Sequence, residues 1–317
     1  MIAAGAITAV FDESLRLQPQ ESCLVVTDSI KEPLGRVFYE AARRRCAQAR
    51  LTVIAPAAEH GVEPPAGVAE EMLGHDVQLL ITSKSLSHTQ ARRTASAAGK
   101  RIASLPAITE EIINRCLDID YRALRVDSER LYNALRDAQR VRVTTALGTD
   151  IWFSPGNSLF IGQTGGSLDF PGAFGNLPEG EVSFSPADCN GVYVVDASFP
   201  ELGILKDPLT FTVKDGVVQS IGGVQAQFVR RRLECAGAAA FRVAELGIGL
   251  NPKARISGIV LEDEKVRGTA HIAVGNNVSY GGTNNVPLHL DGVLRSPYIY
   301  CDENKIMENG AFLSTHL

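Results

Sequence analysis

The sequence predicts an α/β protein in two parts: an N-terminal parallel-sheet α/β domain at residues 1–140 and a mixed α+β, strand-rich domain at residues 141–317. Up to about Pro106, short apolar runs rich in branched residues alternate with helical stretches, which is typical of a parallel sheet covered by helices. Beyond Val141 the chain contains short alternating strands separated by glycine- and proline-rich turns. The length of 317 residues fits two domains.

The first domain begins with an apolar segment, Met1 to Val10, which we expect to start a packed helix rather than a signal peptide, because it lacks a basic start and a cleavage site. Three apolar runs predict buried parallel strands: Cys23 to Thr27, Leu51 to Ala55 and Val77 to Thr82. The stretches between and after them predict helices: Glu32 to Gln48, Gly67 to Leu73, His88 to Gly99 and Tyr121 to Arg140.

The second domain opens with two runs, Val141 to Thr145 and Ile151 to Ser154, that predict a hairpin around a Leu-Gly-Thr-Asp turn. Asp215-Gly216 marks a second turn, between strands at residues 209–213 and 217–221. One helix is expected from about Phe228 to Leu246, with Gly247 ending it.

Composition excludes several classes of protein. Hydrophobic residues make up 45% and charged residues 21%, and the apolar runs are too short for a membrane-spanning helix. A net charge of −5 gives no reason to expect a nucleic-acid partner. The six cysteines form no CxxC pair, as in a reduced, cytoplasmic protein. The acidic excess lies in the second domain, with 18 acidic against 13 basic side chains, which could hold a metal or simply form a solvated surface.

Motifs of serine hydrolases, P-loop enzymes and dinucleotide-binding proteins are absent from the sequence. What remains is the pair His289 and Asp291, which on an extended segment would point the same way and present an imidazole and a carboxylate to one centre. Nitrogen and oxygen donors suit zinc, cobalt, manganese or iron(II). A hydrogen-bonded surface pair is the alternative interpretation.

Two glutamates in apolar surroundings strengthen the metal hypothesis, because a buried carboxylate needs a cation or a partner. Glu181 lies in a turn that opens into a strand, with Glu179 as an alternative donor, and Glu245 lies near the end of the predicted apolar helix. The run from Glu262 to Glu264, next to Lys265 and Arg267, indicates a solvated turn instead.

Four segments of the second domain resemble the metallopeptidases typified by aminopeptidase T, in the same order: residues 176–182, 244–252, 268–275 and 288–291. The resemblance implies hydrolysis of N-terminal peptide bonds of a peptide or small amide by a homodimer with two divalent ions, zinc, cobalt or manganese. It also implies a set of metal ligands, in which Glu181 could instead act as general base and Tyr280 matches a further family tyrosine. The implied ligands are Glu181, Glu245, His271, His289 and Asp291.

The chain also resembles the 2,5-dihydroxypyridine dioxygenases, which share the His-Leu-Asp pair and the preceding Gly281-Gly282. Those enzymes imply one iron(II) on two histidines and one carboxylate, with a histidine where this chain has Glu245 and without counterparts of Glu181 and His271. A histidine of theirs serves as acid/base, which suggests that role for His88. Because the chain keeps the full dinuclear set, the sequence favours the aminopeptidase, with the dioxygenase as the alternative.

Overall fold

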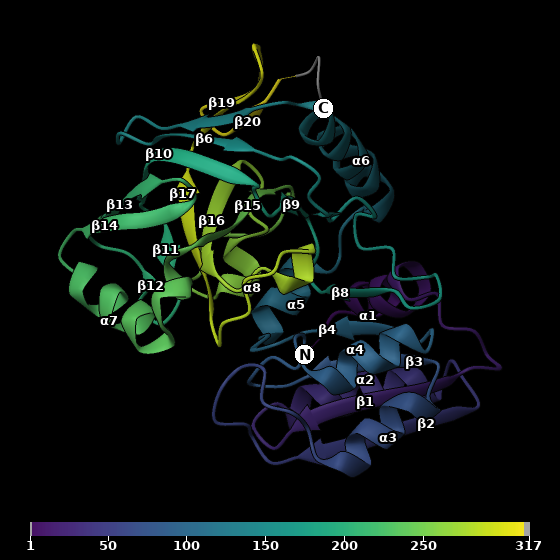
Figure 1. Ribbon diagram of the computed structural model, residues 1–317. Helices are drawn as coiled ribbons and strands as arrows, with labels where there is room; N and C mark the ends of the chain where they lie inside the picture. The colour runs from purple at the N-terminus through teal and green to yellow at the C-terminus, as the bar shows by residue number, and fades with distance from the viewer. Residues whose placement is uncertain (1, 314–317) are drawn as a thin grey trace. The chain divides into compact units, whose positions relative to one another are not determined.

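The computed structural model describes residues 2–313. The chain forms two compact units: residues 1–123 with 166–179, and residues 124–165 with 180–317 (Figure 1). A short segment that follows the first strands of the second unit therefore returns to the first unit. In the part of the chain that is described, no helix is both long and apolar enough to cross a bilayer.

The first unit contains a five-stranded parallel sheet with the strand order β2-β1-β3-β4-β8. Its central strands β1 and β3 are buried along their whole length, as predicted, whereas β2 alternates between exposed and half-buried positions because it forms the edge of the sheet. The strands are β1 (Ser22–Asp28), β2 (Gln48–Ile54), β3 (Val77–Ile81), β4 (Arg101–Ser104) and β8 (Phe174–Asn176).

The helices of this unit connect those strands, and their buried side chains form the core with the sheet. The helix predicted over residues 32–48 ends at Arg43, since the chain must reverse before β2 begins at Gln48. The helices are α1 (Ala4–Thr8), continued by a π-helical turn over Ala9–Ser14, then α2 (Glu32–Arg43), α3 (Ala66–Gly74), α4 (Gln90–Ala97) and α5 (Glu110–Cys116).

The second unit contains two antiparallel sheets. An eight-stranded sheet has the order β14-β13-β10-β6-β5-β18-β19-β20, and it confirms both predicted hairpins. Its strands are β5 (Val141–Thr144), β6 (Asp150–Ser154), β10 (Asp188–Val195), β13 (Leu209–Lys214), β14 (Val217–Gly222), β18 (Tyr298–Cys301), β19 (Asn304–Glu308) and β20 (Ala311–Phe312).

A seven-stranded sheet, with the order β12-β11-β17-β16-β15-β9-β7, carries the five predicted metal ligands, Glu181, Glu245, His271, His289 and Asp291. Its strands are β7 (Phe160–Ile161), β9 (Glu181–Phe184), β11 (Ser198–Phe199), β12 (Gly203–Ile204), β15 (Val243–Gly249), β16 (Thr269–Gly275) and β17 (His289–Arg295). The helices are α6 (Tyr121–Asp137), which confirms the helix predicted from Tyr121, α7 (Ala226–Ala236) and α8 (Val260–Asp263).

The helix predicted from Phe228 to Leu246 is wrong in its second half. Helix α7 ends at Ala236, because Gly237 takes a φ of 97°, and the chain then enters strand β15. Every residue of β15 is buried, since β16 and β9 flank it on both sides. A short apolar run of this kind has no periodicity that separates a buried strand from a buried helix. Glu245 and Gly247 therefore lie on a strand.

Candidate metal centre

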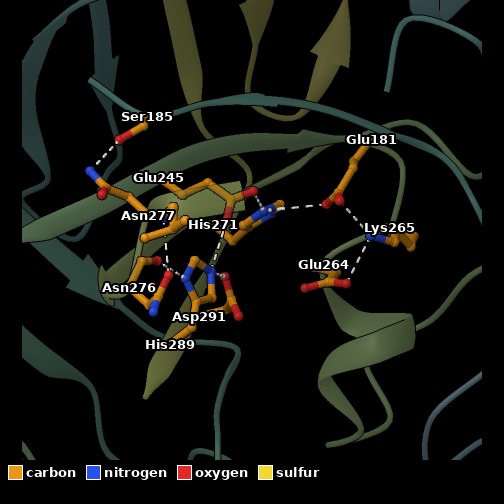
Figure 2. A network of polar contacts seen from close by, with 11 residues as sticks. Glu181, Ser185, Glu245, Glu264, Lys265, His271, Asn276, Asn277, His289 and Asp291 are labelled. Atoms are coloured by element: carbon orange, nitrogen blue, oxygen red, sulfur yellow. Dashed lines mark hydrogen bonds and ion pairs between the residues drawn. The ribbon is translucent and has the colours of Figure 1, made fainter. Parts of the chain in front are cut away.

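The register of four neighbouring strands gathers the predicted ligands on one face of the seven-stranded sheet. Directly opposed residues of antiparallel strands share a face, as do residues two apart on one strand. The predicted ligands come from β9, β15, β16 and β17, and Figure 2 shows their side chains gathered together. Each stands opposite a glycine or alanine. The opposed pairs are Glu181 with Gly249, His271 with Gly247, Glu245 and Asp291 with Ala273, and His289 with Gly275.

These small residues leave room for the ligand side chains. A Cβ added at Gly247 would lie 2.1 Å from both Cε1 and Nε2 of His271, so the imidazole occupies the space that any side chain at position 247 would need. The glycine-rich sequence of β15 is therefore a requirement of the site, whereas helix termination, the role predicted for Gly247, is wrong.

Three predicted ligands form one compact group, which we call the three-ligand face: Glu245, His289 and Asp291. The Nε2 atom of His289 lies 2.9 Å from Oε2 of Glu245 and 3.2 Å from Oδ1 of Asp291. The Nδ1 atom of the same ring lies 2.7 Å from the backbone carbonyl of Asn276. Glu245 and Asp291 are buried, and His289 is partly exposed.

This geometry fits a metal ion. A backbone carbonyl only accepts hydrogen bonds, so Nδ1 of His289 carries a proton and the neutral ring has its lone pair on Nε2. That lone pair faces two carboxylate oxygens, and three acceptors facing one another need a cation between them. In addition, metal-binding histidines usually donate a hydrogen bond from their other ring nitrogen to a carbonyl or carboxylate, as His289 does here. Without a metal, burial lowers the pKa of His289, but Asp291 and Glu245 outweigh burial and raise it well above its ordinary value.

His271 lies beside this face and is fully buried. Its Nε2 atom is 3.3 Å from Oε2 of Glu181 and 3.3 Å from Oε1 of Glu245. Burial alone would lower the pKa of His271, but the contacts with Glu245 and Glu181 raise it to about 9. Its Nδ1 atom is buried without a hydrogen-bond partner among residues 2–313. Glu181, Glu245 and His271 form a second group with metal-ligand spacing.

Two residues of this cluster were missed by the sequence analysis, Glu264 and Lys265. Lys265, only 1% exposed, places its Nζ 2.5 Å from Oε1 of Glu181 and 2.8 Å from Oε1 of Glu264. Glu264 forms a third group with metal-ligand spacing, together with His271 and Asp291. Burial raises the pKa of Glu264 to about 8, although Lys265 acts against this shift.

The solvated turn predicted at residues 262–264 is therefore wrong. Glu262 and Asp263 are fully buried, and their carboxylates accept hydrogen bonds from backbone amides of the preceding loop. Glu262 accepts from Arg255, and Asp263 accepts from Ser257 and Gly258. The available signal in the sequence was the density of acidic residues a few positions before His271. The adjacent basic residues made this run resemble a surface turn.

Tyr280 and His88, the other predicted catalytic residues, have different settings. The ring of Tyr280 stacks on the imidazole of His289, with centroids 6.0 Å apart and planes inclined by 17°. Burial and the carboxylates of Glu245, Glu181 and Asp291 raise the pKa of Tyr280 well above its ordinary value. His88 is an exposed residue of the first unit, before α4, and its role stays a prediction, as does the ligand role of each residue above.

Comparisons with known proteins support one fold and favour one of the two families. The chain is similar to 2,5-dihydroxypyridine dioxygenase from Pseudomonas putida KT2440, with 19% identity and a TM-score of 0.81 over 98% of this chain and 96% of that one. It is similar to wild-type AmpT from Thermus thermophilus, with 17% identity and a TM-score of 0.67 over 98% of both chains. No curated protein sequence matches it. The predicted α/β fold class is thus confirmed, and both known structures share this fold.

A sequence model of the family described as 2,5-dihydroxypyridine 5,6-dioxygenase matches residues 7–314. This match overturns the metallo-aminopeptidase predicted from the sequence, because it points to an oxidoreductase rather than a hydrolase. The preference for hydrolysis rested on the full dinuclear ligand set, including Glu181 and His271, and Lys265 now offers a different partner for Glu181. Since the match spans nearly the whole chain, the protein belongs to the 2,5-dihydroxypyridine 5,6-dioxygenase family.

Proposed function

We propose that this protein is a mononuclear, non-haem iron(II) dioxygenase that opens the ring of a dihydroxylated pyridine. The family match over residues 7–314 supports this reaction class. The observation that carries the metal requirement is the three-ligand face, where Nε2 of His289 lies between carboxylate oxygens of Glu245 and Asp291 at 2.9 and 3.2 Å. Three protein ligands on one side of an ion leave other coordination positions open.

The donor set differs from the two histidines and one carboxylate expected of such a dioxygenase. Here the face has one histidine and two carboxylates, because Glu245 stands where a histidine was expected. Carboxylates are harder donors than imidazole and suit manganese(II) as well as iron(II). When bound, the iron supplies a redox-active centre with open positions at which a hydroxylated ring and O₂ can react.

The protein's own residues hold this face in place. The carbonyl of Asn276 fixes the tautomer and rotation of His289, and the ring of Tyr280 covers the imidazole. His271 contacts the other oxygen of Glu245, so both carboxylate oxygens have an imidazole partner and the carboxylate cannot rotate freely. Ligands fixed by a second set of contacts need little rearrangement on metal binding.

The reaction expected of a 5,6-dioxygenase balances without an external reductant. Both atoms of O₂ enter the substrate as the C5–C6 bond breaks. The hydroxyl-bearing C5 becomes a carboxylic acid, and C6 becomes a formyl group on the ring nitrogen. The two electron pairs needed to reduce O₂ come from the cleaved ring, so a bound metal would undergo no net change in oxidation state.

Oxygen uptake tests the proposal. Protein loaded with iron(II) under anaerobic conditions is mixed with 2,5-dihydroxypyridine and O₂, and we expect one O₂ consumed per substrate, with both atoms of ¹⁸O₂ in the product. Asp291→Asn should abolish uptake. Asp150→Asn is the matched control, because this exposed aspartate pairs only with the surface residue Arg142 among the ion pairs described for residues 2–313. Iron-loaded wild-type protein that consumes no O₂ with dihydroxylated pyridines would refute the function.

A further inference from the structure

Lys265 is a buried lysine inside a cluster of carboxylates. Its Nζ is paired with Oε1 of Glu181 at 2.5 Å and with Oε1 of Glu264 at 2.8 Å (Figure 2). Its side chain is 1% exposed, and those of Glu181 and Glu264 are 11% and 12% exposed. An ammonium group this deeply buried is costly unless opposite charges compensate it, so the position is built around the charge.

The lysine is placed selectively among the possible ligand groups. Among residues 2–313, three groups of side chains have metal-ligand spacing, and two of them include His271. Lys265 pairs with one carboxylate in each of those two, Glu181 in the first and Glu264 in the second. The third group is the three-ligand face, which contains neither of these glutamates.

We propose that Lys265 is a built-in cation that takes the place of a second metal ion, so that the chain binds a single ion on the three-ligand face. This inference rests on the mononuclear centre proposed above and explains how a chain with the acidic ligands of a dinuclear site holds one ion. An ion bound between Glu181 and His271 would lie beside the ammonium, and two cations in one buried site repel each other. A positive charge on the protein itself therefore disfavours the second ion.

The inference also assigns Glu181 a role. Its Oε1 accepts from Lys265, and its Oε2 faces Nε2 of His271 at 3.3 Å. Glu181 is then a positioning residue that links the lysine to His271, and through His271 to Glu245. It does not hold the metal.

Counting metal ions tests the inference without measuring turnover. Metal content by elemental analysis and anaerobic calorimetric titration with iron(II) or manganese(II) should give one ion per wild-type chain. Lys265→Met should bind two ions per chain, and Lys265→Arg should still bind one because it keeps the charge. Lys305→Met is the control, since Lys305 is a surface lysine paired with Glu308. Two ions in the wild type, or one in folded Lys265→Met, would overturn the inference.

A second set of variants applies if Lys265→Met does not fold, since that change leaves two buried carboxylates without their cation. The double variant K265M/E181Q removes both members of the ion pair. We expect Glu181→Gln alone to bind one ion per chain, with affinity lowered by no more than the roughly 10–100-fold that is typical when a supporting contact is removed. A larger loss, beyond roughly 100-fold, would show Glu181 to be a ligand and overturn the inference.

The count of ions is separable from the proposed reaction. One ion per chain without oxygen uptake would refute the dioxygenase and leave the role of Lys265 standing. Two ions per chain with oxygen uptake would refute the role of Lys265 and leave the dioxygenase standing.

Discussion

Gly247→Ala is the perturbation whose effect follows most directly from the geometry of the site. A Cβ at this position would lie 2.1 Å from Cε1 and Nε2 of His271, whereas ordinary contacts begin at 3.4 Å. The imidazole must therefore move by more than 1 Å. Because Nε2 is already 3.3 Å from both Glu181 and Glu245, a shift of that size away from these carboxylates breaks both contacts.

The expected magnitude has two parts. Overpacking a buried site costs roughly 1–3 kcal/mol of unfolding free energy, and for a unit of this size each kcal/mol lowers the melting temperature by roughly 2–4 °C. Loss of the His271 contact releases one side of the Glu245 carboxylate, and removal of such a supporting contact typically weakens metal binding by roughly 10–100-fold. Thermal unfolding and anaerobic calorimetric titration with iron(II) measure the two effects.

Two further variants make the result decisive. Gly222→Ala is a matched control on strand β14, because its Cβ would meet Thr210 at an ordinary 3.9 Å. In the double variant G247A/H271A the ring that causes the clash is absent, so the alanine at position 247 should cost little beyond His271→Ala alone. The reasoning is refuted if Gly247→Ala matches the wild type in stability and metal affinity, or if the two substitutions are simply additive.

Three other predictions test different parts of the chain. Burial would raise the pKa of Asp28, but hydrogen bonds from Ser83 and two backbone amides outweigh it and lower the pKa below its usual value. The stabilisation that Asp28 contributes is therefore present above about pH 4 and is lost as the pH falls through the lower folded-state pKa. Asp28→Asn should lower the free energy of unfolding by roughly 1–3 kcal/mol at pH 7, and urea unfolding at pH 3 should show a smaller difference from the wild type. A difference that stays constant with pH would contradict the argument. Arg92→Lys should destabilise the first unit by roughly 1–2 kcal/mol in the same assay, because lysine cannot replace a planar guanidinium. The guanidinium carbon of Arg92 lies 4.0 Å from the ring centre of Phe174, and its Nε donates to the carbonyl of Ser87 at 2.6 Å. Unchanged stability would show that the stacked geometry is dispensable. Removal of metal from loaded protein by a chelator should lower the free energy of unfolding by about 2.7 kcal/mol relative to protein with metal at a hundred times its Kd, and the melting temperature should fall with it. An unchanged melting curve would argue against the three-ligand face as the metal site.

Several features of the site could be read from the sequence because they depend only on neighbouring residues. His289 and Asp291 share a side of strand β17 because side chains alternate along an extended chain, and this holds whatever the strand packs against. The buried strands β1 and β3 were likewise visible as short apolar runs rich in branched residues. In each case the signal and its cause lie within a few residues of one another.

Other features depended on partners that are distant in the sequence. Glu245 and Gly247 lie on a strand because β9 and β16 supply hydrogen bonds on both sides, which a local apolar run cannot reveal. Lys265 lies in the turn after α8, and its buried ammonium group is neutralised by Glu181 on strand β9. Adjacent acidic and basic residues without a visible partner are typical of a solvated turn, which is what the sequence analysis predicted.

The sequence by itself thus determined the α/β class, the strands with local apolar patterns and most members of the acidic, histidine-containing cluster. Only the tertiary structure decided the strand register, which sets a glycine or alanine opposite each predicted ligand, and the position of the ammonium group among the carboxylates. The physical reason is that alternation along a strand is a property of the local backbone. The free energy of burying a charge, in contrast, depends on which opposite charges the fold brings within contact distance.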